Sequence, residues 1–129
     1  MSRYLLIIKS HMRRKPGTLL PLEEGILAVV ARLQRRGVRE SHGYDIAQHL
    51  RDVSEAKLLT AYGTLYRALA RLEKMGLLAS RWEDPAVAAR EGRPGRRLYA
   101  LTGAGTEAVR GIAITTSRAA ARRRQAARV

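Results

Sequence analysis

The sequence predicts a mainly α-helical α+β fold, and three observations in chain order support this prediction. A helix pattern at residues 41–51 is followed, after a short connection, by a second one with an apolar stripe and a basic back. Two strand-like segments, 77–83 and 97–101, then flank a stretch rich in glycine, proline and arginine. Together these features are typical of a winged helix-turn-helix, in which a helix pair precedes a β-hairpin wing. A C-terminal helix pattern completes the chain.

Residues 1–17 are expected to form a basic leader before the folded domain. Five Lys or Arg residues surround the apolar run YLLII at 4–8, which is far too short to span a bilayer. The run could be an added strand, a helix start or a flap onto the core. The tripeptide SHM at 10–12 resembles a cloning junction, so part of the leader need not be native.

The first helix of the domain is expected over residues 19–36. Thr18 is a candidate N-cap, Pro21 suits the first turn, and Glu23 and Glu24 lie near the positive end of the helix dipole. This position explains the two glutamates better than acid-base catalysis does. Its apolar face is wide enough for a central core helix and comprises Leu22, Ile26, Leu27, Val29, Val30 and Leu33. Gly37 is expected to end it.

The second helix is expected over residues 41–51 and is shorter. Ser41 or His42 would supply its N-cap, and Ile46 and Leu50 are spaced to face inward. A helix, a short connection and a third helix with a basic face make the helix-turn-helix pattern.

After a polar linker at residues 52–55, the third helix is expected within residues 60–78. Leu65, Leu69 and Leu72 recur at the spacing of one helix face, which predicts that they point into the core. Gly76 follows where a left-handed helix stop is wanted.

The opposite side of the third helix is a slim column of small and basic residues without a carboxylate. It comprises Gly63, Arg67, Ala70 and Lys74, flanked by Thr64 and Arg71. Arg67 and Arg71 are like charges four residues apart, which repel by roughly a few tenths of a kcal/mol. A solvated face is the plain alternative, but DNA phosphates or a guanine edge would use this arrangement. For Lys74, the helix dipole at the last turn is a sufficient explanation by itself.

The tyrosines of these helices divide by position. Tyr62 and Thr64, near the start of the third helix, can reach the backbone of a duplex. Tyr66 lies at the edge of the apolar stripe, so a core or hinge role competes with a phosphate contact through its hydroxyl. Tyr44 is expected to pack behind Gly43 rather than touch DNA.

The segments 77–83 and 97–101 are expected to pair as the wing. Trp82 and Tyr99 are assigned to the core at the base of the hairpin, with ligand binding as the alternative. The connection 84–96 is expected to be a long Gly/Pro/Arg loop. Three arginines are candidates for insertion in a DNA groove, with solvated loop charges as the alternative: Arg93, Arg96 and Arg97.

A last helix is expected from about Gly103, capped by Thr102. Four residues at alternating three- and four-residue steps form a narrow seam of the coiled-coil kind: Val109, Ile112, Thr116 and Ala119. The seam is short and poor in large residues. Arg122–Arg124 and Arg128 make the end a basic tail that is expected to fray.

The charge balance indicates a polyanionic partner. In 129 residues, 25 basic residues face 11 acidic ones, for a net charge of +14. Nucleic acid is the first expectation and an anionic membrane the second, while a soluble domain with cationic tails is the plain alternative. The chain has no cysteine, and its three histidines lack metal-ligand spacing. We therefore expect a cytoplasmic protein with no metal, no cofactor and no enzymatic activity.

Four motifs in order resemble the PadR family of bacterial transcriptional regulators. They are HGYDI (42–46), GTLYRALARLEKMGLL (63–78), Trp82 and GRRLYALTGAG (95–105), within a match of roughly residues 18–110. The resemblance implies a homodimeric repressor of the compact type, with one C-terminal helix providing most of the dimer contact. It also implies that the third helix enters the major groove and that the arginine-bearing wing lies along the backbone or minor groove. The wing tip, with residues 85–89 inserted, is longer than the compact pattern needs.

The predicted organisation is therefore a leader (1–17), a winged helix-turn-helix domain (18–102) and a dimerisation helix with a basic tail (103–129). The expected function is sequence-specific regulation of transcription at a palindrome-like operator in double-stranded DNA. A small-molecule effector is implied by the family alone. The alternative is a winged-helix adaptor that binds RNA or a protein, although interface cores are usually depleted in charge.

Overall fold

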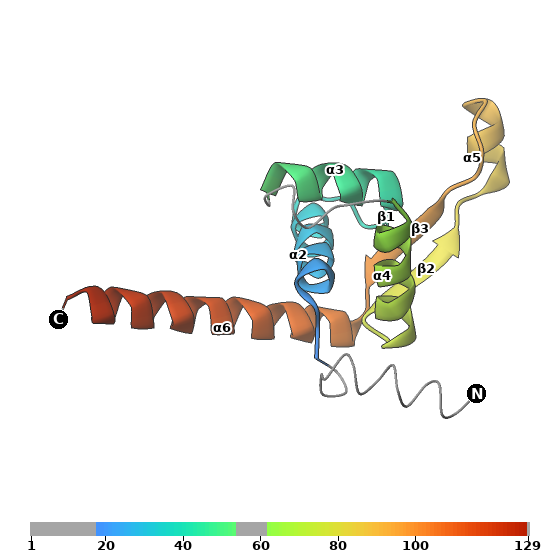
Figure 1. The fold of residues 1–129 in the computed structure, drawn as a ribbon. Helices are drawn as coiled ribbons and strands as arrows, with labels where there is room; N and C mark the ends of the chain where they lie inside the picture. Colours follow the sequence, from blue (N-terminus) through green and yellow to red (C-terminus); the bar gives the residue numbers. More distant parts are fainter. Residues whose placement is uncertain (1–17, 54–61, 129) are drawn as a thin grey trace.

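Helix α2 (Pro21–Arg35) is the element around which the other helices pack. A computed structural model describes residues 18–53 and 62–128 of the chain. Within them α3 (Gly43–Val53), α4 (Tyr62–Lys74) and α6 (Gly103–Ala127) all contact α2. Figure 1 shows α3 lying across one end of α2, with α4 beside it. The predicted leader (1–17) and residues 54–61, which include the second half of the predicted linker, lie outside the described residues.

The core confirms the apolar faces predicted for the first three helices. Leu65, Leu69 and Leu72 of α4 are fully buried, and Ile46 and Leu50 of α3 meet them. The α2 contribution is Ile26, Leu27, Val29, Val30 and Leu33, with Leu22 partly buried against them. Burying each large aliphatic side chain contributes about 1.5–3 kcal/mol, so this cluster is what fixes α4 in place.

The start of α2 differs from the prediction. The helix begins at Pro21 with Leu20 as the N-cap residue, so Thr18 is not the cap. Instead, the backbone N–H of Leu20 donates a hydrogen bond of 2.8 Å to Oε1 of Glu23. A glutamate at the third helical position satisfies a free N–H of the first turn in the same way as in a capping box. Gly37 ends the helix as predicted, with φ of 94°.

Ser41 and His42 do not begin a helix but form a short strand, β1 (Ser41–His42). It pairs with Tyr99 and Leu98 of β3 (Arg97–Leu101), and α3 then begins at Gly43. Helix α3 also continues to Val53, through the first two residues of the predicted linker. The sheet order is β1-β3-β2, with both pairs antiparallel, and β2 spans Leu78–Trp82.

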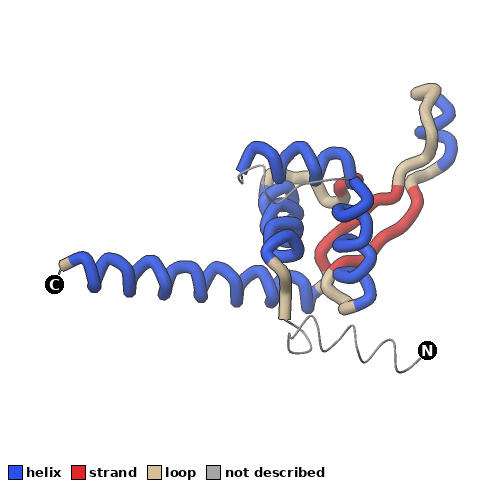
Figure 2. Tube along the Cα trace, in the orientation of Figure 1, coloured by secondary structure: helices blue, strands red, loops and turns tan. Residues whose placement is uncertain are grey.

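The wing hairpin forms as predicted between β2 and β3, but its tip is not a loop. It carries a one-and-a-half-turn helix, α5 (Pro85–Arg90), which Figures 1 and 2 show at the far end of the hairpin. Asp84 caps it by accepting a hydrogen bond of 2.9 Å from the N–H of Ala86, and Pro85 occupies the first turn. Within this helix, Ala88 is the buried residue. The fold is thus a winged helix-turn-helix with a structured wing tip.

Helix α6 begins as predicted and then leaves the body. Oγ1 of Thr102 accepts a hydrogen bond of 3.0 Å from the N–H of Gly105, which caps the helix. Gly105 is buried so closely that a Cβ there would lie 2.0 Å from the carbonyl oxygen of Leu77. The helix continues to Ala127, so the expectation of a frayed tail is wrong. Figure 1 shows its C-terminal part extending away from the other elements. A domain boundary at residue 102 stays a prediction.

Candidate nucleic-acid interface

The outer face of α4 has the composition that its helical period predicts. Gly63, Arg67, Ala70 and Lys74 are all exposed. The guanidinium of Arg67 donates a hydrogen bond of 3.3 Å to Oγ1 of Thr64, and neither Arg67 nor Lys74 has an acidic partner among the described residues. This strip is therefore a set of uncompensated positive charges on a slender helix face. Tyr62 is the first residue of α4, and its side chain lies outside the description.

Arg71 corrects the expectation that the flanking arginines are unneutralised. Its Nε lies 2.8 Å from Oε2 of Glu23, a carboxylate whose side chain is only 2% exposed. No aligned hydrogen bond exists at that nitrogen, so the contact is an ion pair. The predicted repulsion between Arg67 and Arg71 is thus offset within the protein. Arg71 fastens α4 to the start of α2, and a DNA contact by this residue stays a prediction.

Arg93, one of the three predicted wing arginines, is also paired with carboxylates of the protein itself. Arg93 forms ion pairs with Glu83 and, at 2.7 Å, with Glu91. Glu83 also accepts a hydrogen bond of 2.9 Å from the backbone N–H of Arg96. The Arg93 guanidinium holds the pKa of Glu83 below its ordinary value, and the two carboxylates raise the pKa of Arg93 further. This network joins the two sides of the wing below α5, so Arg93 is a structural element of the wing.

Arg97 is also held within the fold, whereas Arg96 is not. The Arg97 guanidinium lies 3.4 Å from Oε1 of Glu73 on α4 and 5.4 Å from the ring centroid of Trp82. The Arg96 side chain makes no ion pair or hydrogen bond with any described residue. Of the three predicted wing arginines, Arg96 is therefore the one whose charge is available to a partner.

Trp82 is not a core residue, which corrects the prediction. Its side chain is 64% exposed, because the end of the hairpin extends past the helices that cover Leu78. Tyr99, in contrast, is buried as predicted. Tyr44 is 55% exposed and stacks on His42 at 6.5 Å between ring centroids, so it is not packed into the core. Burial holds the pKa of His42 below its ordinary value, although Asp45, 3.2 Å away, opposes the shift.

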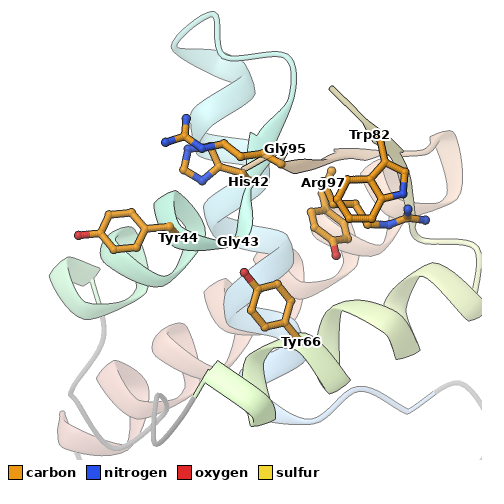
Figure 3. A pocket seen from close by; sticks show the side chains of 9 residues that line it. His42, Gly43, Tyr44, Tyr66, Trp82, Gly95 and Arg97 are labelled. Atoms are coloured by element: carbon orange, nitrogen blue, oxygen red, sulfur yellow. The ribbon is translucent and has the colours of Figure 1, made fainter. Parts of the chain in front are cut away.

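These exposed aromatics line a cleft of about 410 Å³ between the helix-turn-helix and the wing. Its lining comes from β1 and the start of α3, from α4, and from β2, β3 and the residues just before β3: His42, Gly43, Tyr44, Tyr66, Trp82, Gly95, Arg96, Arg97 and Tyr99. Figure 3 shows the hydroxyl of Tyr66 directed toward Gly43, with Trp82 and Arg97 on the other side. A Cβ at Gly43 would lie 2.8 Å from that hydroxyl. Tyr66 therefore faces the cleft, and is half exposed rather than part of the core.

Two of the four residues of the predicted dimer seam on α6 pack within the subunit. Val109 and Ile112 pack against the core, close to α2. Thr116 is exposed and Ala119 half-buried on the projecting part of the helix, and Ile114 is 52% exposed. A dimer role for these four residues stays a prediction.

Two acidic residues were missed by reasoning from the sequence. Glu23 was assigned to the helix dipole alone, although its place three residues after Leu20 is a capping signal. Glu83 gave no local signal, because its partner Arg93 lies across the wing. Within residues 18–53 and 62–128, no cluster of three or more His, Cys, Asp or Glu residues could hold a metal ion. None of the helices described has the length and apolar character needed to cross a membrane.

Comparison with known proteins agrees with the fold. The family model "Transcriptional regulator PadR-like family" matches residues 26–111, which span β1, the three-helix core and the wing. No match was found among curated proteins.

Solved structures are similar over most of their length. A PadR family transcription regulator from Clostridium difficile is 25% identical, with a TM-score of 0.59 over 78% of this chain and 91% of that one. A PadR-like transcription factor from Bacteroides fragilis is 26% identical, with a TM-score of 0.56 over 92% and 96%. A PadR-like regulator from Bacillus cereus, 19% identical with a TM-score of 0.60 over 81% and 88%, supports the fold alone.

Proposed function

The chain belongs to the PadR-like family of DNA-binding transcriptional regulators, and from this premise we propose that it is a cytoplasmic homodimeric repressor. It would bind a palindrome-like operator and carry out no catalysis. The observation that carries the proposal is the exposed strip Gly63, Arg67, Ala70 and Lys74, which no described carboxylate neutralises.

The composition of this strip suits the major groove of DNA. A helix can enter that groove, and small residues such as Gly63 and Ala70 let its backbone come close to the bases. Arg67 lies between them and would donate two hydrogen bonds to a guanine edge, which discriminates against other bases by about 1–3 kcal/mol. Lys74, at the end of α4, would contact a phosphate. The buried stripe and the Glu23–Arg71 ion pair hold the helix for this contact.

The wing would contribute the second contact of each subunit. Arg96 is the predicted wing arginine without an acidic partner among described residues, and the Glu83 network fixes the backbone from which it extends. A cation at this place suits the narrow, negatively polarised minor groove or its flanking phosphates.

Dimerisation would place two copies of α4 in successive major grooves, about 34 Å apart. We propose that the projecting part of α6, with Thr116, Ala119 and the exposed Ile114, joins the two subunits. Repression would follow from occlusion of a promoter. An effector, if the regulator has one, would act by changing the angle between the two DNA-binding halves.

The test is a gel shift on the DNA upstream of the protein's own coding region, with a scrambled duplex as competitor. A specific repressor retains the upstream fragment against a large excess of scrambled DNA, and its binding weakens steeply with salt. Equal affinity for both duplexes at physiological salt would contradict specific regulation. It would favour the alternative, a winged-helix adaptor that binds RNA or a protein partner.

A further inference from the structure

The cleft between α4 and the wing contains exposed aromatic rings and arginines that do not belong to the strip proposed to contact bases. Its walls carry the phenol of Tyr66, which is 48% exposed, and the indole of Trp82, which is 64% exposed. It contains two arginines. Arg96 has no acidic partner in the described part of the chain. Arg97 is paired with Glu73 and lies over the ring of Trp82. The cleft thus presents one available guanidinium and one phenolic hydroxyl beside aromatic rings. Figure 3 shows the rings of Tyr66 and Trp82 on two sides of the cleft.

We propose that this cleft is the seat for one sugar–phosphate unit of the operator strand that runs between the two grooves. Arg96 and the Tyr66 hydroxyl would donate to the phosphate, and the ring of Trp82 would cover the sugar. This inference rests on the proposed function and goes beyond it, because it assigns a single phosphate jointly to α4 and the wing.

The geometry of the duplex supports this occupant. Adjacent major and minor grooves are separated by one sugar–phosphate strand, so a protein with a helix in one groove and a wing in the next must straddle that strand. The cleft lies between α4 and the base of the wing, where the straddled strand would pass. Its volume of about 410 Å³ is large enough for one sugar–phosphate unit.

The chemistry of the lining supports the same occupant. Phosphate oxygens are commonly bound by arginine and by side-chain hydroxyls, including that of tyrosine. The Tyr66 hydroxyl makes no hydrogen bond with a described residue, so it is available as a donor. Gly43 leaves room for the Tyr66 hydroxyl at this place. A Cβ at position 43 would lie 2.8 Å from the hydroxyl oxygen and displace it.

The experiment uses the full-length protein and a duplex that it selects from a random-sequence pool. Single phosphates of that duplex are replaced one at a time by uncharged methylphosphonate, and the affinity of each is measured with wild type, Arg96→Gln and Tyr66→Phe. In each half-site, loss of one charged contact predicts about tenfold weaker binding for Arg96→Gln. Because the dimer has two half-sites, the salt slope should be smaller by about 2. Loss of a neutral hydrogen bond predicts about three- to tenfold weaker binding per half-site for Tyr66→Phe.

The decisive result is the phosphate at which these losses overlap. At one phosphate in each half-site, methylphosphonate should weaken wild type by more than it weakens either Arg96→Gln or Tyr66→Phe, because each variant has already lost one of the two contacts to that phosphate. Gly43→Ala should reproduce the Tyr66→Phe profile without changing any charge. Arg110→Gln, on α6 and outside the cleft, is the matched charge control and should leave the profile unchanged.

Two failures are distinguishable. If wild type selects no preferred duplex, the proposed function itself is wrong. If wild type binds its selected duplex but Arg96→Gln and Tyr66→Phe bind it equally well, or respond to different phosphates, only the cleft assignment is overturned. Retained affinity in both variants would leave a small anionic ligand as the occupant to examine.

Discussion

The ion pair between Glu23 and Arg71 should stabilise the position of α4, and Glu23→Gln tests this directly. Two contacts of the carboxylate carry this prediction: Oε1 accepts from the N–H of Leu20, and Oε2 lies 2.8 Å from Nε of Arg71. A glutamine keeps the size and an oxygen that can accept from Leu20, because Glu and Gln serve equally at this capping position. The substitution therefore removes the charge and little else.

The expected loss of unfolding free energy lies between the values for surface and for buried ion pairs. An exposed pair contributes up to about 1 kcal/mol, whereas breaking a buried pair costs about 3–5 kcal/mol. Here the Glu23 side chain is 2% exposed but that of Arg71 is 36% exposed. We therefore expect Glu23→Gln to lower the free energy of unfolding by about 1–2 kcal/mol. Glu23→Ala, which also leaves the N–H of Leu20 unpaired, should cost about 1 kcal/mol more.

Urea unfolding at one fixed protein concentration measures these losses, with an unchanged m-value showing that the same transition is observed. Glu24→Gln is the matched control, because it removes a charge from the same helical turn without touching Arg71. It should cost no more than the dipole interaction, about 0.5 kcal/mol. If Glu23→Gln and Glu24→Gln lower the free energy of unfolding by the same amount, the ion pair contributes nothing beyond the helix dipole. Arg71 would then be available to contact DNA.

Three further outcomes are expected. Gly105→Ala should destabilise the fold by about 1–3 kcal/mol, because its Cβ would meet a backbone carbonyl at 2.0 Å, whereas Gly103→Ala, with open space around it, should be nearly neutral in thermal unfolding. Glu83→Gln should weaken DNA binding in a gel shift although it removes a negative charge near DNA, since it releases Arg93 and loosens the wing; tighter binding would refute a structural role. The pKa of His42 is lowered mainly by burial, so the unfolded chain binds its proton more strongly and stability falls as pH drops below about 6.5. In His42→Gln, the midpoint of urea unfolding should fall less between about pH 7 and pH 5 than it does in wild type. An equally steep fall in the variant would contradict this reasoning.

Helical period and turn residues were sufficient to predict the helix-turn-helix core. The spacing of Leu65, Leu69 and Leu72 determines which side of α4 is buried, and the opposite side follows from geometry alone. Gly37 and Gly76 end their helices with φ of 94° and 79°, as expected for residues without a Cβ penalty. These features depend on neighbours within a few residues, which is why sequence alone reveals them.

The errors concern partners that are distant in the chain. The period places Arg71 at the edge of the basic face, but nothing local indicates that Glu23 lies beside it. Ser41 is in a strand only because β3 provides a partner, and the local sequence favours a helix cap equally well. Trp82 shares a face with Leu78, yet the hairpin extends past the helices, so Trp82 has the Arg97 guanidinium beside its ring and no core side chain from the described part of the chain.

The helix α5 is a different kind of error, because its signal was local. Asp84 followed by Pro85 is a strong start signal, and the next residues are good helix formers. The surrounding glycines, prolines and arginines indicated a loop and outweighed it. A six-residue helix is nevertheless formed, since Asp84 caps it and its own residue Ala88 is buried.

The most direct test of the central claim is to compare wild type and Arg67→Ala on every single-base-pair variant of the selected duplex. If α4 reads bases in the major groove, Arg67→Ala should lose about 1–3 kcal/mol of affinity per half-site and stop discriminating at one base pair in each half-site. Discrimination at all other positions should be retained. A uniform loss at every position would mean that Arg67 contacts only the backbone, and unchanged binding would mean that the outer face of α4 does not face DNA.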